Sequence, residues 1–329
     1  MKMRLVLSAL AACAMLCAVP RTACAKIFPM IFVTNLNLRG FGAEPLAPAT
    51  GTVGVYDGKT GTFDPTLVTG LHGPQAIAEA AGKLFVVNSA TGTIGEYDAE
   101  AGTALNPALI MGLHGRVGIA AFGDNLFVTS AATHRIDEYS ATTGQLIQLG
   151  FVMGLKLKGP AELTVAGGNL FVVNSTASKN SESIGEYNAT TGATVNSSLV
   201  TGLHGRVDIA VSGTNLFVTN VPKGSIDEYD AVTGALLTAG FVTELHGPSD
   251  IAVFGGDLFV TDAQHQSVNM FNATTGMSEG AVLTGLHGPQ GITIVPVSGS
   301  VPDASSTWLL LFLGLVAAFG LKLIAPQTA

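Results

Sequence analysis

The sequence has little charge and an excess of acidic over basic side chains. Charged residues make up 12% of its 329 residues, about half the share of a typical soluble domain, whereas 47% are hydrophobic. That balance excludes an intrinsically disordered chain, which needs high charge and low hydrophobicity. The net charge is −8, from 15 Lys and Arg against 23 Asp and Glu. It excludes a nucleic-acid partner, because phosphate binding needs clustered positive charge.

Cysteines and catalytic motifs are also scarce. The three cysteines all lie within the first 25 residues, too few for a disulfide framework. The sequence contains no Gly-x-Ser-x-Gly elbow, Walker motif, His-Glu-x-x-His or Cys-x-x-Cys, so the enzyme classes with these signatures are not indicated. No stretch between residues 28 and 297 has a sustained apolar period of 3.6 residues, and we expect no helix there.

Residues 1–25 have the pattern of a secretory signal peptide. Lys2 and Arg4 precede an apolar stretch that is short for a membrane span, and Ala23 and Ala25 form a small-x-small cleavage site. The chain is therefore expected to be exported. Cleavage after Ala25 removes every cysteine and leaves 12 basic and 23 acidic residues, a net charge of −11. The stability of the exported chain must then come from packing alone.

Residues 298–329 carry a second targeting pattern. Val301, Pro302 and Asp303 precede an apolar run of about 18 residues from Trp308, which is near the lower limit for a membrane-spanning helix. This tail resembles the PEP-CTERM/VPDSG-type sorting signals, and the resemblance implies processing by an exosortase. The basic cluster of those signals is reduced to Lys322. A simple membrane anchor explains the same apolarity. Either alternative places the protein in the cell envelope or outside the cell, held at least transiently in a membrane.

One unit is repeated through the middle of the chain. The phrase Gly-Leu-His-Gly or a close variant recurs at intervals of 42, 42, 48, 42 and 41 residues, starting at Gly70, Gly112, Gly154, Gly202, Glu244 and Gly285. In each interval, four short apolar segments rich in Val, Ile, Phe, Tyr and Thr are separated by Gly, Asn and Asp. Those features predict strands joined by tight turns. Four strands in about 42 residues are typical of a β-propeller blade.

The strand count predicts six blades and the way in which the ring closes. Residues 30–35 match the second strand of a blade, so the chain begins inside a blade, and residues 291–296 form a first strand with no others after it. The last strand is expected to complete the N-terminal blade, which removes the edges of the ring. We therefore predict an all-β domain over residues 26–297, a six-bladed propeller of four-stranded blades.

The repeated phrases also carry a family resemblance. Leu-x-Gly-Pro-x-x-Ile-Ala, Leu-Phe-Val-Thr-Asn/Asp and Ile-x-Glu-Tyr-Asp follow one another in the blades. This pattern resembles the NHL-type blade and is similar to the six-bladed gluconolactonase-like and streptogramin-lyase-like propellers. The resemblance implies the fold and says little of function, because this architecture hosts enzymes and binding proteins alike.

Five histidines occupy one repeated position. In a propeller, the loops from fourth to first strands and from second to third strands share one face. A ring at the mouth of the channel is therefore expected from His72, His114, His204, His246 and His287. Imidazoles bind metals, but a residue repeated in nearly every blade more commonly supports the blade. Symmetric ligands around a wide pore are also too far apart to share one ion.

Differences between the blades point to a candidate metal site. The start of the first strand is acidic in three successive blades, at Glu162, Asp208 and Asp250, and small in the other three. On the same face, the second strands of this sector end in Asn174, Asn220 and Asp262. Carboxylate and amide oxygens suit a divalent cation such as calcium, and the gluconolactonase-like resemblance implies such an ion in this region. The alternative is a solvated acidic channel mouth.

Two functions remain open from the sequence. The first is a non-enzymatic binding or extracellular-matrix module that uses the acidic channel face, with a protein or polysaccharide ligand at the cell surface. The alternative is a divalent-metal-dependent lactonase- or lyase-like enzyme. The binding module predicts that Asp208→Ala leaves stability unchanged, whereas the enzyme predicts that this substitution removes the metal.

Overall fold

The computed structural model describes residues 29–36, 50–57, 63–115, 117–155, 162–174, 182–205 and 207–295. The chain divides into two compact units, Met1–Val295 and Pro296–Ala329, and the second lies wholly outside the described residues. The predicted signal peptide and the Val301-Pro302-Asp303 motif lie outside them as well. Within the described ranges, no helix is long and apolar enough to cross a membrane.

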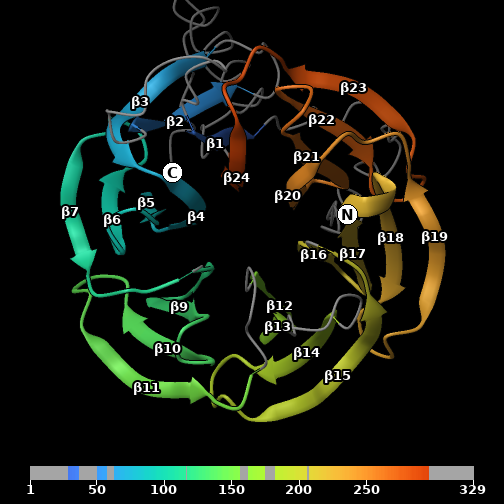
Figure 1. The fold of residues 1–329 in the computed structure, drawn as a ribbon, viewed down its shortest axis with the longest axis horizontal. Helices are drawn as coiled ribbons and strands as arrows, with labels where there is room; N and C mark the ends of the chain where they lie inside the picture. The colour runs from blue at the N-terminus through green and yellow to red at the C-terminus, as the bar shows by residue number, and fades with distance from the viewer. Residues whose placement is uncertain are drawn as a thin grey trace, which may run out of the picture. The chain divides into compact units, whose positions relative to one another are not determined.

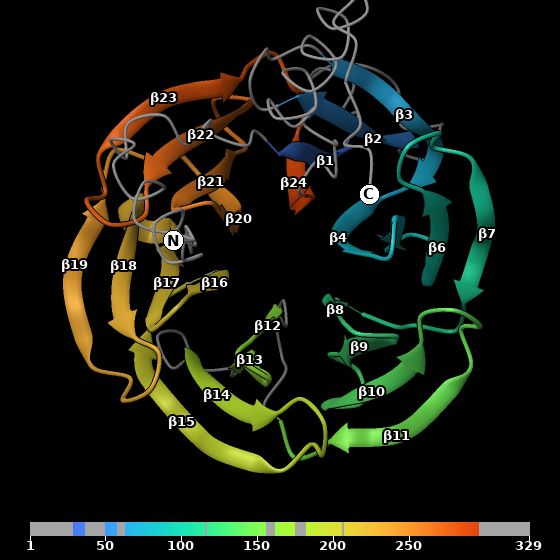
Figure 2. The same cartoon turned by 180° about the vertical axis from the view of Figure 1, so that it is seen from behind.

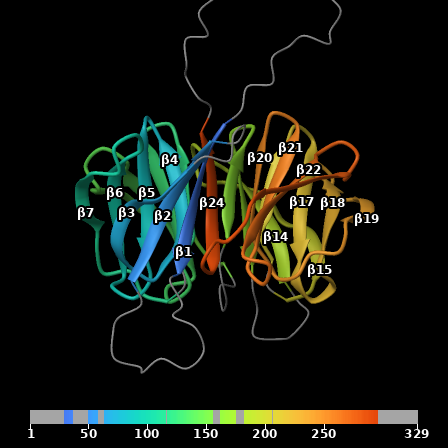
Figure 3. The same cartoon turned by 90° about the horizontal axis from the view of Figure 1, so that it is seen from above.

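Six four-stranded antiparallel sheets surround a central axis, as Figures 1 and 2 show. The innermost strands are β4 (Pro74–Ala80), β8 (Ile119–Phe122), β12 (Leu163–Ala166), β16 (Ile209–Ser212), β20 (Pro248–Phe254) and β24 (Pro289–Val295). The second strands are β1 (Met30–Leu36), β5 (Lys83–Asn88), β9 (Asn125–Ser130), β13 (Asn169–Asn174), β17 (Asn215–Asn220) and β21 (Asp257–Asp262). Figure 3 shows the ring from its edge, with the strands running between its two faces.

The third strands are β2 (Thr50–Asp57), β6 (Thr93–Asp98), β10 (Arg135–Ser140), β14 (Glu182–Asn188), β18 (Ser225–Asp230) and β22 (Ser267–Asn272). The outer strands are β3 (Phe63–His72), β7 (Ala104–Ile110), β11 (Leu146–Val152), β15 (Thr194–Leu203), β19 (Leu236–Val242) and β23 (Ser278–Leu283). We number the blades 1 to 6 so that blade 1 is β24-β1-β2-β3 and blades 2 to 6 follow in chain order.

The predicted six-bladed propeller and its closure are confirmed. Strand β24 pairs with β1 in antiparallel register, with Met30 opposite Val295, so the last strand completes the blade that the N-terminal strands began. All six sheets therefore have the same four-stranded order, and none of the described blades lacks a strand. The predicted absence of helices holds for the described residues except for one 3₁₀ turn, Val221–Lys223, which contains Pro222.

The hydrophobic core lies between the blades. The second strands are buried along almost their whole length, because both faces pack against neighbouring blades, and such strands need apolar residues on both faces. The Phe of the repeated Leu-Phe-Val phrase shows this in blades 2, 3 and 5, where Phe85, Phe127 and Phe217 are fully buried. Six clusters of buried side chains result, each combining residues of two adjacent blades. The outer strands, in contrast, begin with exposed residues.

Candidate functional site

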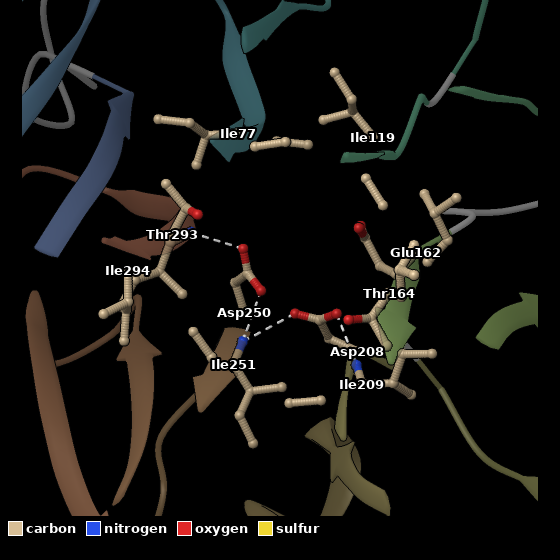
Figure 4. A pocket seen from close by; sticks show the side chains of 18 of the residues that line it. Ile77, Ile119, Glu162, Thr164, Asp208, Ile209, Asp250, Ile251, Thr293 and Ile294 are labelled. Atoms are coloured by element: carbon tan, nitrogen blue, oxygen red, sulfur yellow. Dashed lines mark hydrogen bonds between the residues drawn. The ribbon is translucent and has the colours of Figure 1, made fainter. Parts of the chain in front are cut away.

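The inner strands of all six blades enclose a cavity of about 290 Å³ (Figure 4). Most of its lining consists of Ile, Val, Ala, Leu and Thr side chains. Four residues with carboxylate side chains also line it: Glu79, Glu162, Asp208 and Asp250. None of the described residues that line the cavity is Lys, Arg or His. The cavity therefore carries an excess of negative charge.

Asp208 directly precedes β16 and connects blade 5 to blade 6. Its Oδ1 accepts a hydrogen bond from the backbone N–H of Ile209 at 2.7 Å, and its Oδ2 accepts one from Ile251 in β20 at 3.0 Å. The backbone N–H of Asp208 donates to Thr219 Oγ1 at 2.8 Å, and the residue is 5% exposed. These contacts fix the carboxylate in one orientation, so Asp208 has a structural role between two blades.

Asp250 makes the equivalent connection between blade 6 and blade 1. Its Oδ1 accepts from Ile251 N at 2.7 Å, and its Oδ2 accepts from Ile292 N in β24 at 2.7 Å. Burial is the main cause that raises the pKa of Asp250 from 3.8 to about 6; hydrogen bonding with Asp208 opposes the rise, and the negative charge of Glu162 adds to it. A carboxylate that titrates near neutral pH lies in the cavity as a result.

Glu162 directly precedes β12 in blade 4, and Figure 4 shows its side chain directed into the cavity. The three carboxylates that the sequence predicts as one acidic sector thus line the same cavity from three successive blades. The equivalent positions in the other blades are Ala76, Gly118 and Gly291. The charge is consequently concentrated on one side of the channel at this level.

The other three predicted metal ligands, Asn174, Asn220 and Asp262, do not line this cavity. Asn174 hydrogen-bonds through its side chain with Tyr187 of the neighbouring third strand. Asn220 Nδ2 donates to Asp227 Oδ2 at 3.3 Å. Asp262 accepts three backbone hydrogen bonds from loops. The structure does not gather all six residues around the cavity, and a cation at the three acidic side chains remains a prediction.

The five repeated histidines lie outside the cavity lining as well. His114, His204, His246 and His287 are exposed, and His72 is half-buried. In two loops, the backbone N–H of the histidine donates to the last residue of a second strand, from His72 to Asn88 at 3.1 Å and from His246 to Asp262 at 2.9 Å. The backbone of this position therefore fixes the loop, while the exposed imidazoles are available to solvent.

Two features of the cavity were not predicted from the sequence. Glu79 adds a fourth carboxylate. A comparison of the blades could have found it, because the other five have apolar residues at the equivalent position. Threonines of the second strands hold the start of the first strands: Thr34, Thr129 and Thr219 accept from the backbone N–H of Gly291, Gly118 and Asp208 at 2.7–2.8 Å. These threonines are typical strand residues, so their pattern alone indicates no special role.

No protein-family model matches the sequence, and no curated protein matches it. Among solved structures, the fold is similar to that of a chain in the crystal structure of a nidogen/laminin complex, with a TM-score of 0.60. The two chains are 13% identical, and the similarity covers 82% of this chain and 98% of the other. At this level of identity the comparison shows the propeller fold alone.

Proposed function

We propose that this protein is an exported, cell-surface-associated propeller that binds a partner through the acidic cavity of its channel. The observation that carries this proposal is the cavity lining, with four carboxylates and no basic side chain among the described residues. A positively charged group of the partner would balance that charge. The backbone hydrogen bonds of Asp208 and Asp250 support the proposal, because they hold both carboxylates in place without neutralising them.

The chemistry of the cavity favours a protein partner over a neutral polysaccharide. A Lys or Arg side chain has a cationic end that the carboxylates of the cavity would attract, whereas a neutral polysaccharide carries no such charge. The similar chain comes from the crystal structure of a nidogen/laminin complex, so a chain of this fold occurs in a complex between proteins. We carry over only the class of function, a binding or matrix module.

Export and surface association are part of the same proposal. They rest on the signal-peptide pattern of residues 1–25 and on the tail with its Val301-Pro302-Asp303 motif. Detection of mature chain that starts at Lys26 in the envelope fraction would support export. An uncleaved chain confined to the cytoplasm would refute it.

Binding can be tested with a fluorescent oligolysine peptide and the full-length protein. Glu162→Gln removes one charge from the cavity with little change in size, and we expect it to weaken binding several-fold at low ionic strength. Glu100→Gln is the matched control, because Glu100 lies in an exposed turn of blade 2. Equal affinities for the two variants would contradict the channel as the binding site.

The metal-dependent enzyme is the second candidate, and the raised pKa of Asp250 is the observation in its favour, because perturbed carboxyl groups are common at catalytic sites. This candidate requires a stoichiometric calcium or similar ion that Glu162→Gln releases, together with turnover of a lactone. Calcium binding without turnover across a lactone panel would leave the binding module as the better account.

A further inference from the structure

Two exposed histidines and one buried carboxylate lie together at the corner where the chain enters blade 6. The side chains of His246, Asp262 and His265 each offer a ligand atom, and these atoms lie within 4.8 Å of one another. His265 Nδ1 is 3.1 Å from Asp262 Oδ2, and the centroids of the two imidazole rings are 4.3 Å apart. Across the described parts of the chain, no other group of three such residues meets this spacing.

Asp262 is held as a rigid anchor in this cluster. It is 1% exposed, and its Oδ2 accepts from the backbone N–H of His246 at 2.9 Å. Its Oδ1 accepts from the backbone N–H groups of Gln264 at 3.2 Å and His265 at 3.0 Å. Hydrogen bonds of this kind orient a metal-binding carboxylate, and the three backbone bonds leave one lone pair of Oδ2 available for a metal. The side chain of His265 is 56% exposed, so it is able to adjust its position.

The cluster is a departure from the repeat and not a product of it. Where blade 6 has Asp262, the equivalent positions in the second strands of the other blades hold Asn or Ser: Asn35, Asn88, Ser130, Asn174 and Asn220. Where blade 6 has His265, blades 2, 3 and 5 have Thr91, Thr133 and Lys223. The same loop forms in blade 2 without these changes, where Asn88 Oδ1 accepts from the backbone N–H of His72 at 3.1 Å. The architecture of the blade therefore does not require the Asp and the second His.

We propose that His246, Asp262 and His265 form a zinc-binding site, with water as the fourth ligand. Two imidazoles and one carboxylate are a common donor set for zinc, and they do not suit calcium, which prefers oxygen ligands. Ligand atoms around one tetrahedral zinc ion lie roughly 3.3 Å apart, given bonds of about 2.0 Å. The two exposed imidazoles need to close by only about 1.5 Å or less from the present limit of 4.8 Å. This site lies outside the cavity lining and does not depend on the proposed channel function.

The experiment is a zinc titration by calorimetry on the untagged full-length protein after removal of metal with a chelator. The unsubstituted protein is expected to bind one zinc ion. His265→Thr and Asp262→Asn introduce the residues of other blades and are expected to weaken zinc binding at least about tenfold. His114→Ala is the matched control: His114 occupies the same loop position, but Ser130 and Thr133 stand where blade 6 has Asp262 and His265. It is expected to bind zinc like the unsubstituted protein.

Thermal unfolding of each metal-free variant establishes that the fold is retained. It also gives a second readout: zinc should raise the unfolding midpoint of the unsubstituted protein but not that of His265→Thr. The proposal is overturned if the unsubstituted protein binds no zinc, or if His265→Thr and Asp262→Asn bind zinc as tightly as the His114→Ala control. Calcium is not expected to bind at this site. Any shift of the unfolding midpoint with calcium should therefore be the same in the unsubstituted protein and in His265→Thr, because it comes from binding elsewhere.

Discussion

Replacement of Asp208 tests whether the channel carboxylates hold the blades together. Asp208→Ala leaves the backbone N–H of Ile209 without its acceptor in a buried environment, whereas the N–H of Ile251 keeps its 2.7 Å hydrogen bond to Asp250 Oδ1. Such a loss costs about 1–3 kcal/mol. The second bond of Ile251 to Asp208 adds little, so we expect the free energy of unfolding to fall by about 1–3 kcal/mol in total. The sequence alone predicts no change for this substitution in a binding module, whereas the hydrogen bonds of Asp208 predict a loss of stability.

Asp98→Ala is a matched control for the number of hydrogen bonds. Asp98 Oδ1 also accepts two backbone N–H bonds, from Glu100 at 2.9 Å and Ala101 at 2.7 Å, but in an exposed turn. Water replaces a lost acceptor there, and we expect a cost of about 1 kcal/mol or less. Urea unfolding followed by circular dichroism gives both values, provided that the dependence on urea is the same in all variants. Asp208→Ala no more destabilising than Asp98→Ala would refute the role of Asp208 as a connection between blades.

Three further predictions concern single features of blades 3, 5 and 6. Burial raises the pKa of Asp250 to about 6, so its stabilising contribution is complete below about pH 4 and is lost as the pH rises through about 6. Chemical unfolding at several pH values should show a decline of up to about 3 kcal/mol across this range that is absent in Asp250→Asn. Glu244 has a φ of +66° where the equivalent residues are glycines, so Glu244→Gly should stabilise the protein by about 0.5–1 kcal/mol in urea unfolding; a loss of stability would show that the Glu side chain has a compensating contact. Ser130→Asp combined with Thr133→His should give blade 3 a zinc site with His114 and raise the stoichiometry to two in the zinc titration, and a folded variant that still binds one ion would show that these three side chains are insufficient.

The architecture was predictable because the repeated phrases are visible in the sequence. The spacing of the Leu-His-Gly phrases indicated the length of a blade. The strand count predicted six blades and the closure of blade 1 by the last strand, a closure in which Met30 lies opposite Val295. Both inferences use only the order of short apolar segments. Neither depends on which side chains touch.

The roles of individual polar residues were less accessible, because their partners lie one repeat away. Asp208 and Asp250 accept hydrogen bonds from residues 43 and 42 positions later in the chain. Within one blade, the partner also lies on another strand: Glu138 and Glu228 of the third strands accept from Asn125 and Asn215 of the second strands at 2.7 and 2.8 Å. A carboxylate that recurs or clusters in the sequence does not show whether its oxygens face a ligand or a backbone N–H of the next blade.

The repeated histidines alone do not indicate the cluster in blade 6, of which only His246 belongs to the repeat. His265 belongs to no repeated position, so a search by periodicity passes over it, and Asp262 is grouped with the asparagines of other blades. In a repeat protein, a phrase that is repeated in every blade commonly has a structural role. The residues with the most freedom to bind a ligand are those that differ from the phrase. Asp262 and His265 both differ in the same blade, and the fold brings them to the one histidine of the repeat that they can reach. Two independent departures that converge on one 4.8 Å cluster are a stronger indication of a site than five histidines distributed around a ring.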